Sequence, residues 1–102
     1  MEIKVDVYTN KMVLSSDGKK MTFNAKEPFT TTRLLIGKFF AAEECLKNAV
    51  KEFGAIGFFK RAPKITIEPH EFLEGGLSEV EDRILREIAL GAGAREAHVV
   101  VK

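Results

Sequence analysis

The feature that most constrains this chain is a strand–helix–strand pattern in its second half. Residues 64–68 alternate polar and apolar side chains, residues 78–90 carry an apolar stripe at helical spacing, and residues 96–101 are mostly apolar. Ser78, with Glu81 three residues later, is typical of a capping box at the start of the helix. Because such crossovers are right-handed and join parallel strands, both strands are expected to lie in one sheet.

The first quarter of the chain predicts three further strands. Residues 3–8 alternate with apolar side chains at odd positions, but the apolar positions become even after residues 9–11. We interpret this change of phase as a bend or bulge. Asp17-Gly18 supplies the positive φ that a tight hairpin turn needs, and a returning strand is expected at residues 21–25. Residues 34–36 are expected to form a short extended piece.

A helix is predicted from Phe39 to a stop at Gly54. The order strand-strand-strand-helix-strand-helix-strand predicts an α/β fold with about five mixed strands and two helices on one face. The 102 residues are expected to form a single domain, 1–102. The buried stripes are predicted to comprise Ala42, Cys45, Leu46, Ala49, Val50 and Phe53 in the first helix and Val80, Ile84, Leu85, Ile88 and Ala89 in the second.

The charge balance gives no electrostatic reason to expect nucleic acid or an anionic membrane as a partner. Sixteen basic and fifteen acidic residues leave a formal net charge of +1. The single cysteine, Cys45, excludes an internal disulfide, and the first residues lack the shape of a signal peptide. No apolar run approaches the roughly 20 residues that span a bilayer. A cytoplasmic location is therefore expected.

No complete set of residues for catalysis, metal binding or nucleotide binding is evident. Gly75-Gly76 before Ser78 would allow backbone N–H groups to face an anion, but a flexible loop feeding a capped helix explains the same residues. Paired carboxylates can act in acid–base chemistry, although acidic residues near a helix start also favour the helix dipole. The carboxylates concerned are Glu68, Glu71, Glu74, Glu79 and Glu81.

The histidines and the cysteine are weak candidates for chemistry. His70 has acidic neighbours in the sequence, but a metal site needs three or four ligands with defined geometry, so no metal and no cofactor are expected. His98 is expected to face solvent from a strand, and Cys45 to be a small core residue. Residues 58–61 (FFKR) are aromatic and basic, which favours a partly buried connector or a protein contact over nucleic-acid stacking.

Two blocks of the chain carry distinctive local motifs. The first, residues 35–51, begins with LIGKFFAAEECL. The second, residues 62–101, holds PKITIEP at 63–69, SEVEDR at 78–83 and GAGARE at 91–96. Both blocks resemble the bacterial actin-like, rod-shape-determining MreB family, and together they cover a little over half of the chain. The resemblance implies a piece of the actin-like ATPase fold, of the ribonuclease-H-like class, that matches its first subdomain.

The resemblance also implies where an ATP site would lie. Asp6 matches an acidic residue of the family's first phosphate loop, and Glu81 matches a glutamate that positions the attacking water. Tyr8, however, stands where the family has the glycine that lets the backbone approach phosphate. The second phosphate loop and the adenosine-binding lobe are expected to lie beyond Lys102. A nucleotide pocket with one wall does not exclude water, so no ATPase activity is expected.

The sequence therefore predicts a non-catalytic, actin-like small domain that acts through protein–protein contacts, with a copy of itself or with a full-length actin-like protein. The hairpin region and the loop 70–77 are the expected contact regions. The alternative is a nucleotide- or anion-binding subunit that completes its site by oligomerisation. Its candidate residues are Asp6, Gly75, Gly76, Ser78 and Glu81.

Overall fold

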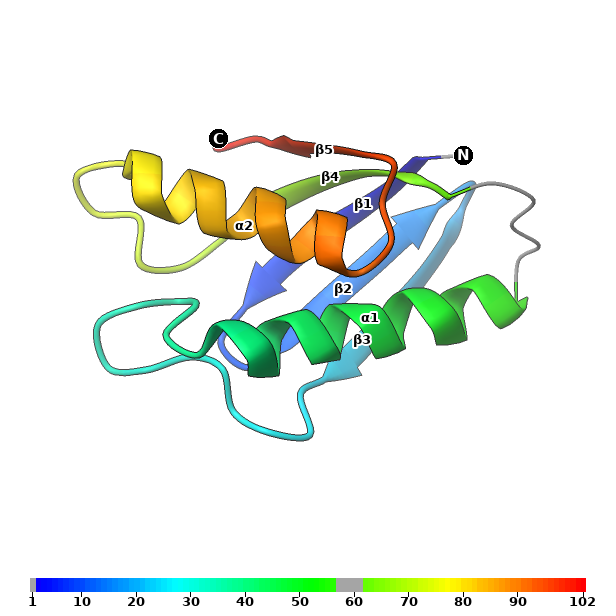
Figure 1. Cartoon of the computed structure of the whole chain (residues 1–102), viewed down its shortest axis with the longest axis horizontal. Coiled ribbons are helices and arrows are strands. Elements are labelled where there is room, and N and C mark those ends of the chain that lie inside the picture. The colour runs from blue at the N-terminus through cyan, green and yellow to red at the C-terminus, as the bar shows by residue number, and fades with distance from the viewer. Residues whose placement is uncertain (1, 57–61) are drawn as a thin grey trace.

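One mixed sheet of five strands carries two helices on the same face (Figure 1). The computed structural model describes residues 2–56 and 62–102. The strands lie in the order β3-β2-β1-β4-β5. Strand β2 is antiparallel to both of its neighbours, β1 and β3, whereas β4 is parallel to both β1 and β5. This architecture confirms the α/β class and the predicted order of elements. The strands are β1 (Glu2–Tyr8), β2 (Lys11–Ser16), β3 (Lys19–Asn24), β4 (Lys64–Pro69) and β5 (Glu96–Val99), and the helices are α1 (Phe39–Ile56) and α2 (Glu79–Gly91).

A two-residue turn at Thr9 and Asn10 joins β1 to β2, so the bend or bulge expected there was wrong. Val7 pairs with Met12 across this hairpin. In this register an odd-numbered residue of β1 faces an even-numbered residue of β2, and the apolar phase has to change. Asn10 takes a left-handed φ of 52°, which asparagine tolerates better than most residues. The second hairpin has its predicted turn, with positive φ at both residues of Asp17-Gly18.

Residues 25–38 form a loop, and the extended piece expected at residues 34–36 is absent from it. Phe29 is fully buried in this loop. The backbone N–H groups of Gly37 and Lys38 donate to the carbonyl of Phe29 at 2.8 and 2.9 Å, and Thr30 Oγ1 donates to the carbonyl of Leu35 at 2.8 Å. These internal hydrogen bonds satisfy the backbone without strand pairing.

Helix α1 continues to Ile56, past the stop expected at Gly54. A glycine inside a helix costs only about 1 kcal/mol, and the long buried stripe of α1 outweighs it. The stripe predicted for α1 is buried at every position: Ala42, Cys45, Leu46, Ala49, Val50 and Phe53.

Helix α2 starts at the predicted cap and buries Leu85, Ile88 and Ala89 against the sheet, while Ile84 is half-buried. Val80 was expected in the core but is 67% exposed. It lies in the first turn, where it lines an open groove with the loop at residues 34–36.

Strand β5 ends at Val99, before the expected end at Val101, although the N–H of Val100 still donates to the carbonyl of Ile67 at 3.0 Å. The connector predicted at residues 57–63 lies largely outside the described residues, and so does its aromatic and basic part at 58–61. Within residues 2–56 and 62–102, no helix has both the length and the apolar character to cross a bilayer.

Candidate functional site

Polar side chains gather on the face of the sheet that the helices leave uncovered, which we call the open face. The odd-numbered residues of β1, such as Val5, belong to the core that the sheet shares with the helices, so the even-numbered Asp6 points to the open face. The parallel register of β1 and β4 places Asp6 beside Glu68. The N–H of His70 donates to the carbonyl of Val7 at 3.0 Å and extends this pairing past the end of β4.

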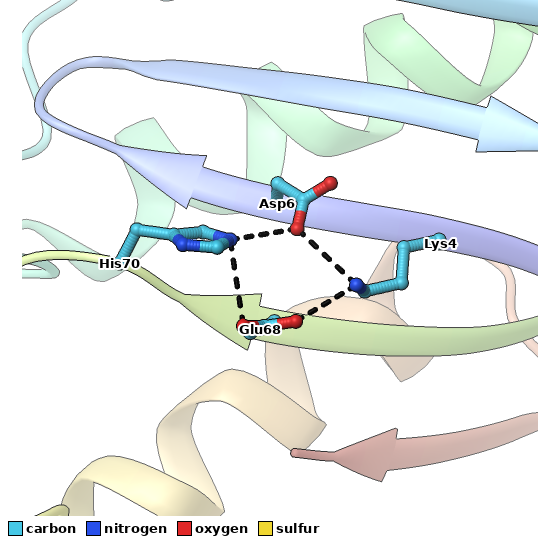
Figure 2. Close-up of polar contacts among 4 residues, drawn as sticks. All are labelled: Lys4, Asp6, Glu68 and His70. Carbon is cyan, nitrogen blue, oxygen red and sulfur yellow. Dashed lines mark hydrogen bonds and ion pairs between the residues drawn. The ribbon is translucent and has the colours of Figure 1, made fainter. Parts of the chain in front are cut away.

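Four side chains on the open face form an ionic cluster, which consists of Lys4, Asp6, Glu68 and His70 (Figure 2). His70 Nε2 lies 2.7 Å from Asp6 Oδ1 and 3.7 Å from Glu68 Oε2. Lys4 Nζ lies 2.7 Å from Glu68 Oε1 and 3.5 Å from Asp6 Oδ1. The two carboxylates are therefore held between an imidazole on one side and an ammonium group on the other.

Glu68 is the member of the ionic cluster most shielded from water, with 2% of its surface exposed. The close contact with Lys4 holds the pKa of Glu68 below its usual value, although burial acts in the opposite direction. The same contact raises the pKa of Lys4. Lys4 Nζ approaches Glu68 Oε1 as an ion pair, but no described donor reaches this oxygen with good hydrogen-bond geometry. The Lys4 ammonium group is thus the close partner of Glu68 Oε1 among the described residues.

Tyr8 supports the ionic cluster from the end of β1. Its ring stacks on that of His70, with ring centroids 4.7 Å apart and planes inclined by 9°. Lys11 begins β2, the other strand of the hairpin, and its Nζ lies 5.2 Å from the centroid of the Tyr8 ring. In the turn that follows, the N–H of Thr9 donates to the carboxylate of Glu71, and the N–H of Asn10 donates to a threonine hydroxyl at 3.1 Å. Both backbone donors of this turn therefore have partners within the chain.

The remaining residues of the predicted nucleotide or anion site lie around the start of α2. Gly75 and Gly76 have φ of 78° and 87° in the preceding loop. Ser78 Oγ accepts from the N–H of Glu81 at 3.1 Å, and the N–H of Ser78 donates to Glu81 Oε1 at 3.3 Å, as the predicted capping box requires. The carboxylate of Glu81 thus occupies the helix N-terminus, whereas Asp6 belongs to the ionic cluster.

The sequence places Glu68 close to His70, but the meeting of these two residues with Asp6 and Lys4 was not predicted. Part of this cluster could have been read from the sequence, because Lys4 and Asp6 are two residues apart in a strand and so lie on the same face. Parallel pairing of β1 with β4 then brings Glu68 beside them. Nothing in the alternation itself indicates that these two strands are neighbours.

Two other residues lie where the sequence places them. Cys45 is buried in the α1 stripe, and burial raises the pKa of its thiol to about 11. His98 faces solvent, with 55% of its side chain exposed and Nε2 at 3.5 Å from Glu96 Oε1.

A second candidate feature is an apolar groove of about 170 Å³ beside the start of α2. One wall comes from the loop at residues 34–36, and the other comes from Leu77 and from Val80 and Ile84 of α2. Leu34 is 44% exposed and, like Val80, lies open to solvent. Glu71 and Glu81 also line the groove, so apolar surface is bordered by negative charge.

The chain is similar to two kinds of bacterial protein. It is 30% identical over 93 residues to the uncharacterised protein YjaA of Escherichia coli K12, and the match covers 86% of this chain and 73% of YjaA. It is also 30% identical over 66 residues to the cell shape-determining protein MreB of Pasteurella multocida, and 32% identical to MreB of E. coli. The MreB matches cover 65% of this chain but only 18% of MreB. No protein-family model matches the chain.

Proposed function

The chain belongs to the family of the E. coli protein YjaA, and on this premise we propose that it is a non-catalytic, actin-like small domain that acts by binding another protein. The similarity to MreB and the five-stranded α/β fold support the actin-like part of this proposal. The ribonuclease-H-like class and the cytoplasmic location expected from the sequence belong to the same proposal.

The observation that carries the binding role is the apolar groove beside α2. Its volume of about 170 Å³ lies below the roughly 300–1,000 Å³ typical of small-molecule pockets, but it suits one or two apolar side chains of a protein segment. Exposed apolar residues at its edge, Leu34 and Val80, offer hydrophobic surface that remains uncovered in the single chain.

The charges around the groove define the partner by its chemistry. Glu71 and Glu81 line the groove. An adjoining hollow shares Glu71 with it and is also lined by Glu74 and by one basic residue, Arg33. An acidic border favours a partner segment in which apolar anchors are flanked by lysine or arginine. We assign the groove to such a segment of a separate protein, and the MreB homologue of the same organism is the first candidate.

The absence of ATPase activity is part of the proposal and has its own support. Tyr8 replaces the glycine expected in a phosphate loop, and its ring stacks on His70. The N–H of Thr9, which would face a phosphate in such a loop, donates instead to Glu71. A phosphate-release assay with Mg-ATP should give no turnover above buffer. Turnover that disappears in an Asp6→Asn variant would support the nucleotide-binding alternative.

The binding role is tested with the purified chain and the MreB homologue. The mass in solution should be that of a monomer, and the chain should co-sediment with polymerised MreB. Val80→Lys should abolish co-sedimentation by placing a charge in the groove. Leu90→Lys is the matched control, because Leu90 is 50% exposed at the other end of α2. A lack of co-sedimentation, or equal loss in both variants, would reject the groove as the binding surface.

A further inference from the structure

We infer that Asp6, Glu68 and His70 form a binding site for a divalent first-row transition-metal ion such as Zn²⁺. This inference does not depend on the proposed protein contact, because it concerns the open face of the sheet rather than the groove beside α2. It also goes against the expectation from the sequence, in which no metal site was foreseen. The side chains concerned are those drawn in Figure 2.

The donor set fits this class of ion. One imidazole nitrogen with two carboxylate oxygens suits zinc, cobalt, nickel or manganese, whereas magnesium prefers oxygen ligands alone. Three protein ligands leave coordination positions for water on the solvent side. Such a three-ligand arrangement is typical of open metal sites rather than of closed structural ones.

The spacing of the donor atoms also fits. One ligand atom from each of the three residues lies within 4.8 Å of the others. Metal–ligand bonds of about 2.1 Å place neighbouring donors about 3–3.5 Å apart, and opposite donors about 4.2 Å apart. His70 Nε2 already lies 2.7 and 3.7 Å from the two carboxylates. Shifts of a few tenths of an ångström to about 1 Å, within the reach of side-chain rotation, would complete the arrangement.

The surrounding fold holds these ligands in place. Asp6 and Glu68 are opposite each other in a parallel ladder, which fixes the separation of their backbones. The ring of His70 is oriented by the stacked Tyr8, and its backbone N–H is bound to the carbonyl of Val7. Glu68 is almost fully buried, and its Oε1 accepts no hydrogen bond of good geometry. A buried carboxylate that a rigid strand holds near His70 is a pre-formed ligand.

Lys4 competes with the ion for the two carboxylates. Its ammonium group contacts both carboxylates, so the fold already places one positive charge against them. A metal ion competes with this ammonium group, and the Lys4 side chain, 34% exposed, has room to move into solvent. With a neutral imidazole, two carboxylates and one lysine sum to one negative charge, which favours exchange of the ammonium for a divalent ion. Lys4 is thus expected to weaken metal binding.

The test is calorimetric titration of chelator-treated protein with Zn²⁺, together with the visible absorption spectrum after addition of Co²⁺. We expect one ion per chain. His70→Gln and Asp6→Asn should each weaken binding by roughly tenfold or more, because each removes a ligand. Lys4→Met should strengthen binding by a similar factor. A purely structural ion-pair cluster would show no such gain when Lys4 is removed.

His98→Gln is the matched control, because His98 is exposed and also lies beside a carboxylate, that of Glu96. It should leave the affinity and the Co²⁺ spectrum unchanged. Circular dichroism of every variant distinguishes loss of a ligand from loss of the fold, and His70→Gln changes a partly exposed side chain that the core does not need. The inference is overturned if neither wild type nor Lys4→Met binds Zn²⁺. It is equally overturned if His70→Gln binds like wild type, or if His98→Gln abolishes binding.

Discussion

The carboxylates of Asp6 and Glu68 lie side by side on neighbouring parallel strands, and each contacts the same two side chains, Lys4 and His70. Glu68 is almost completely buried, whereas Lys4 reaches it from a partly exposed position. The ion pair of Lys4 with Glu68 is therefore intermediate between an exposed and a buried one. Its removal should have a measurable effect on the stability of the fold.

Lys4→Met should lower the free energy of unfolding by about 1–2 kcal/mol at pH 7, between the values typical of exposed and buried pairs. The folded-state pKa of Glu68 is lowered from 4.5, so its contribution is complete above that pH and is lost as the pH falls through the folded-state value. The pKa of Lys4 is raised from 10.5, so its contribution is complete below pH 10 and is lost only in stronger alkali.

Urea unfolding at pH 7 and pH 3.5 measures this effect. The difference between Lys4→Met and wild type should shrink at pH 3.5, because the Glu68 carboxyl of the unfolded chain binds a proton below about pH 4.5 while the lowered pKa resists protonation in the folded chain. Lys64→Met is the control, because the contact of Lys64 with Glu96 at 3.4 Å is exposed and should contribute less. A loss of equal size at both pH values would contradict the role of Glu68.

Asn10→Ala should destabilise the chain by about 2–3 kcal/mol. It removes the Oδ1 acceptor that binds the N–H groups of Phe29 and Thr30 at 2.9 and 2.8 Å, and it places alanine at a left-handed φ. Asn10→Asp keeps the acceptor and should cost less than about 1 kcal/mol. Asp17→Ala, at φ 48° in the other hairpin, measures the cost of placing alanine at a left-handed φ without the loss of the Asn10 hydrogen bonds. It should lower the free energy of unfolding by about 1 kcal/mol. Urea midpoints that are equal for Asn10→Ala and Asp17→Ala would refute the anchoring of the loop by Asn10.

The sequence predicted the regular elements because their burial follows simple periods. The stripe of α1 and the cap of α2 at Ser78 depend on neighbours in the chain and were confirmed. The turn at Thr9-Asn10 was misinterpreted because a change of apolar phase fits either a bulge or a two-residue hairpin. Only the pairing of Val7 with Met12 distinguishes the two.

Features that depend on distant packing were not predictable in the same way. Phe29 joins the hydrophobic core of the sheet and helices from loop 25–38, which no local period indicates. Val80 continues the apolar stripe of α2 but lies in its first turn, where it borders the groove instead of the core. The meeting of Asp6 with His70 requires the neighbour relation of β1 and β4, which is a property of the whole sheet.

Gly93→Ala should destabilise the chain by about 1 kcal/mol or more, because φ is 105° at this position and disfavours any side chain. Gly91→Ala, two positions earlier in the chain, tests space instead. A Cβ there would lie closest to the side chain of Glu43, which has to rotate away, and alanine favours the helix. Gly91→Ala should therefore be neutral or slightly stabilising in thermal unfolding, and a loss as large as that of Gly93→Ala would show that Glu43 is held rigidly.

Cys45 should react slowly with an aromatic disulfide reagent at pH 8. Its thiol is buried and its pKa is raised to about 11, so about 0.1% of it is thiolate at that pH. The rate in the folded chain should be at least about 100-fold below the rate in 8 M urea, and stopped-flow absorbance gives both values. Equal rates would place Cys45 at the surface rather than in the α1 stripe.

Binding of another protein in the groove beside α2 is tested most directly by amide chemical-shift mapping. The labelled chain is titrated with a monomeric variant of the MreB homologue, and the shift of every amide is followed. We expect the changes to gather at the groove and to be absent in Val80→Lys. The residues concerned are Leu34, Leu77, Val80 and Ile84. Changes confined to the open face around Thr66 and His98, or no change at any concentration, would contradict binding in the groove.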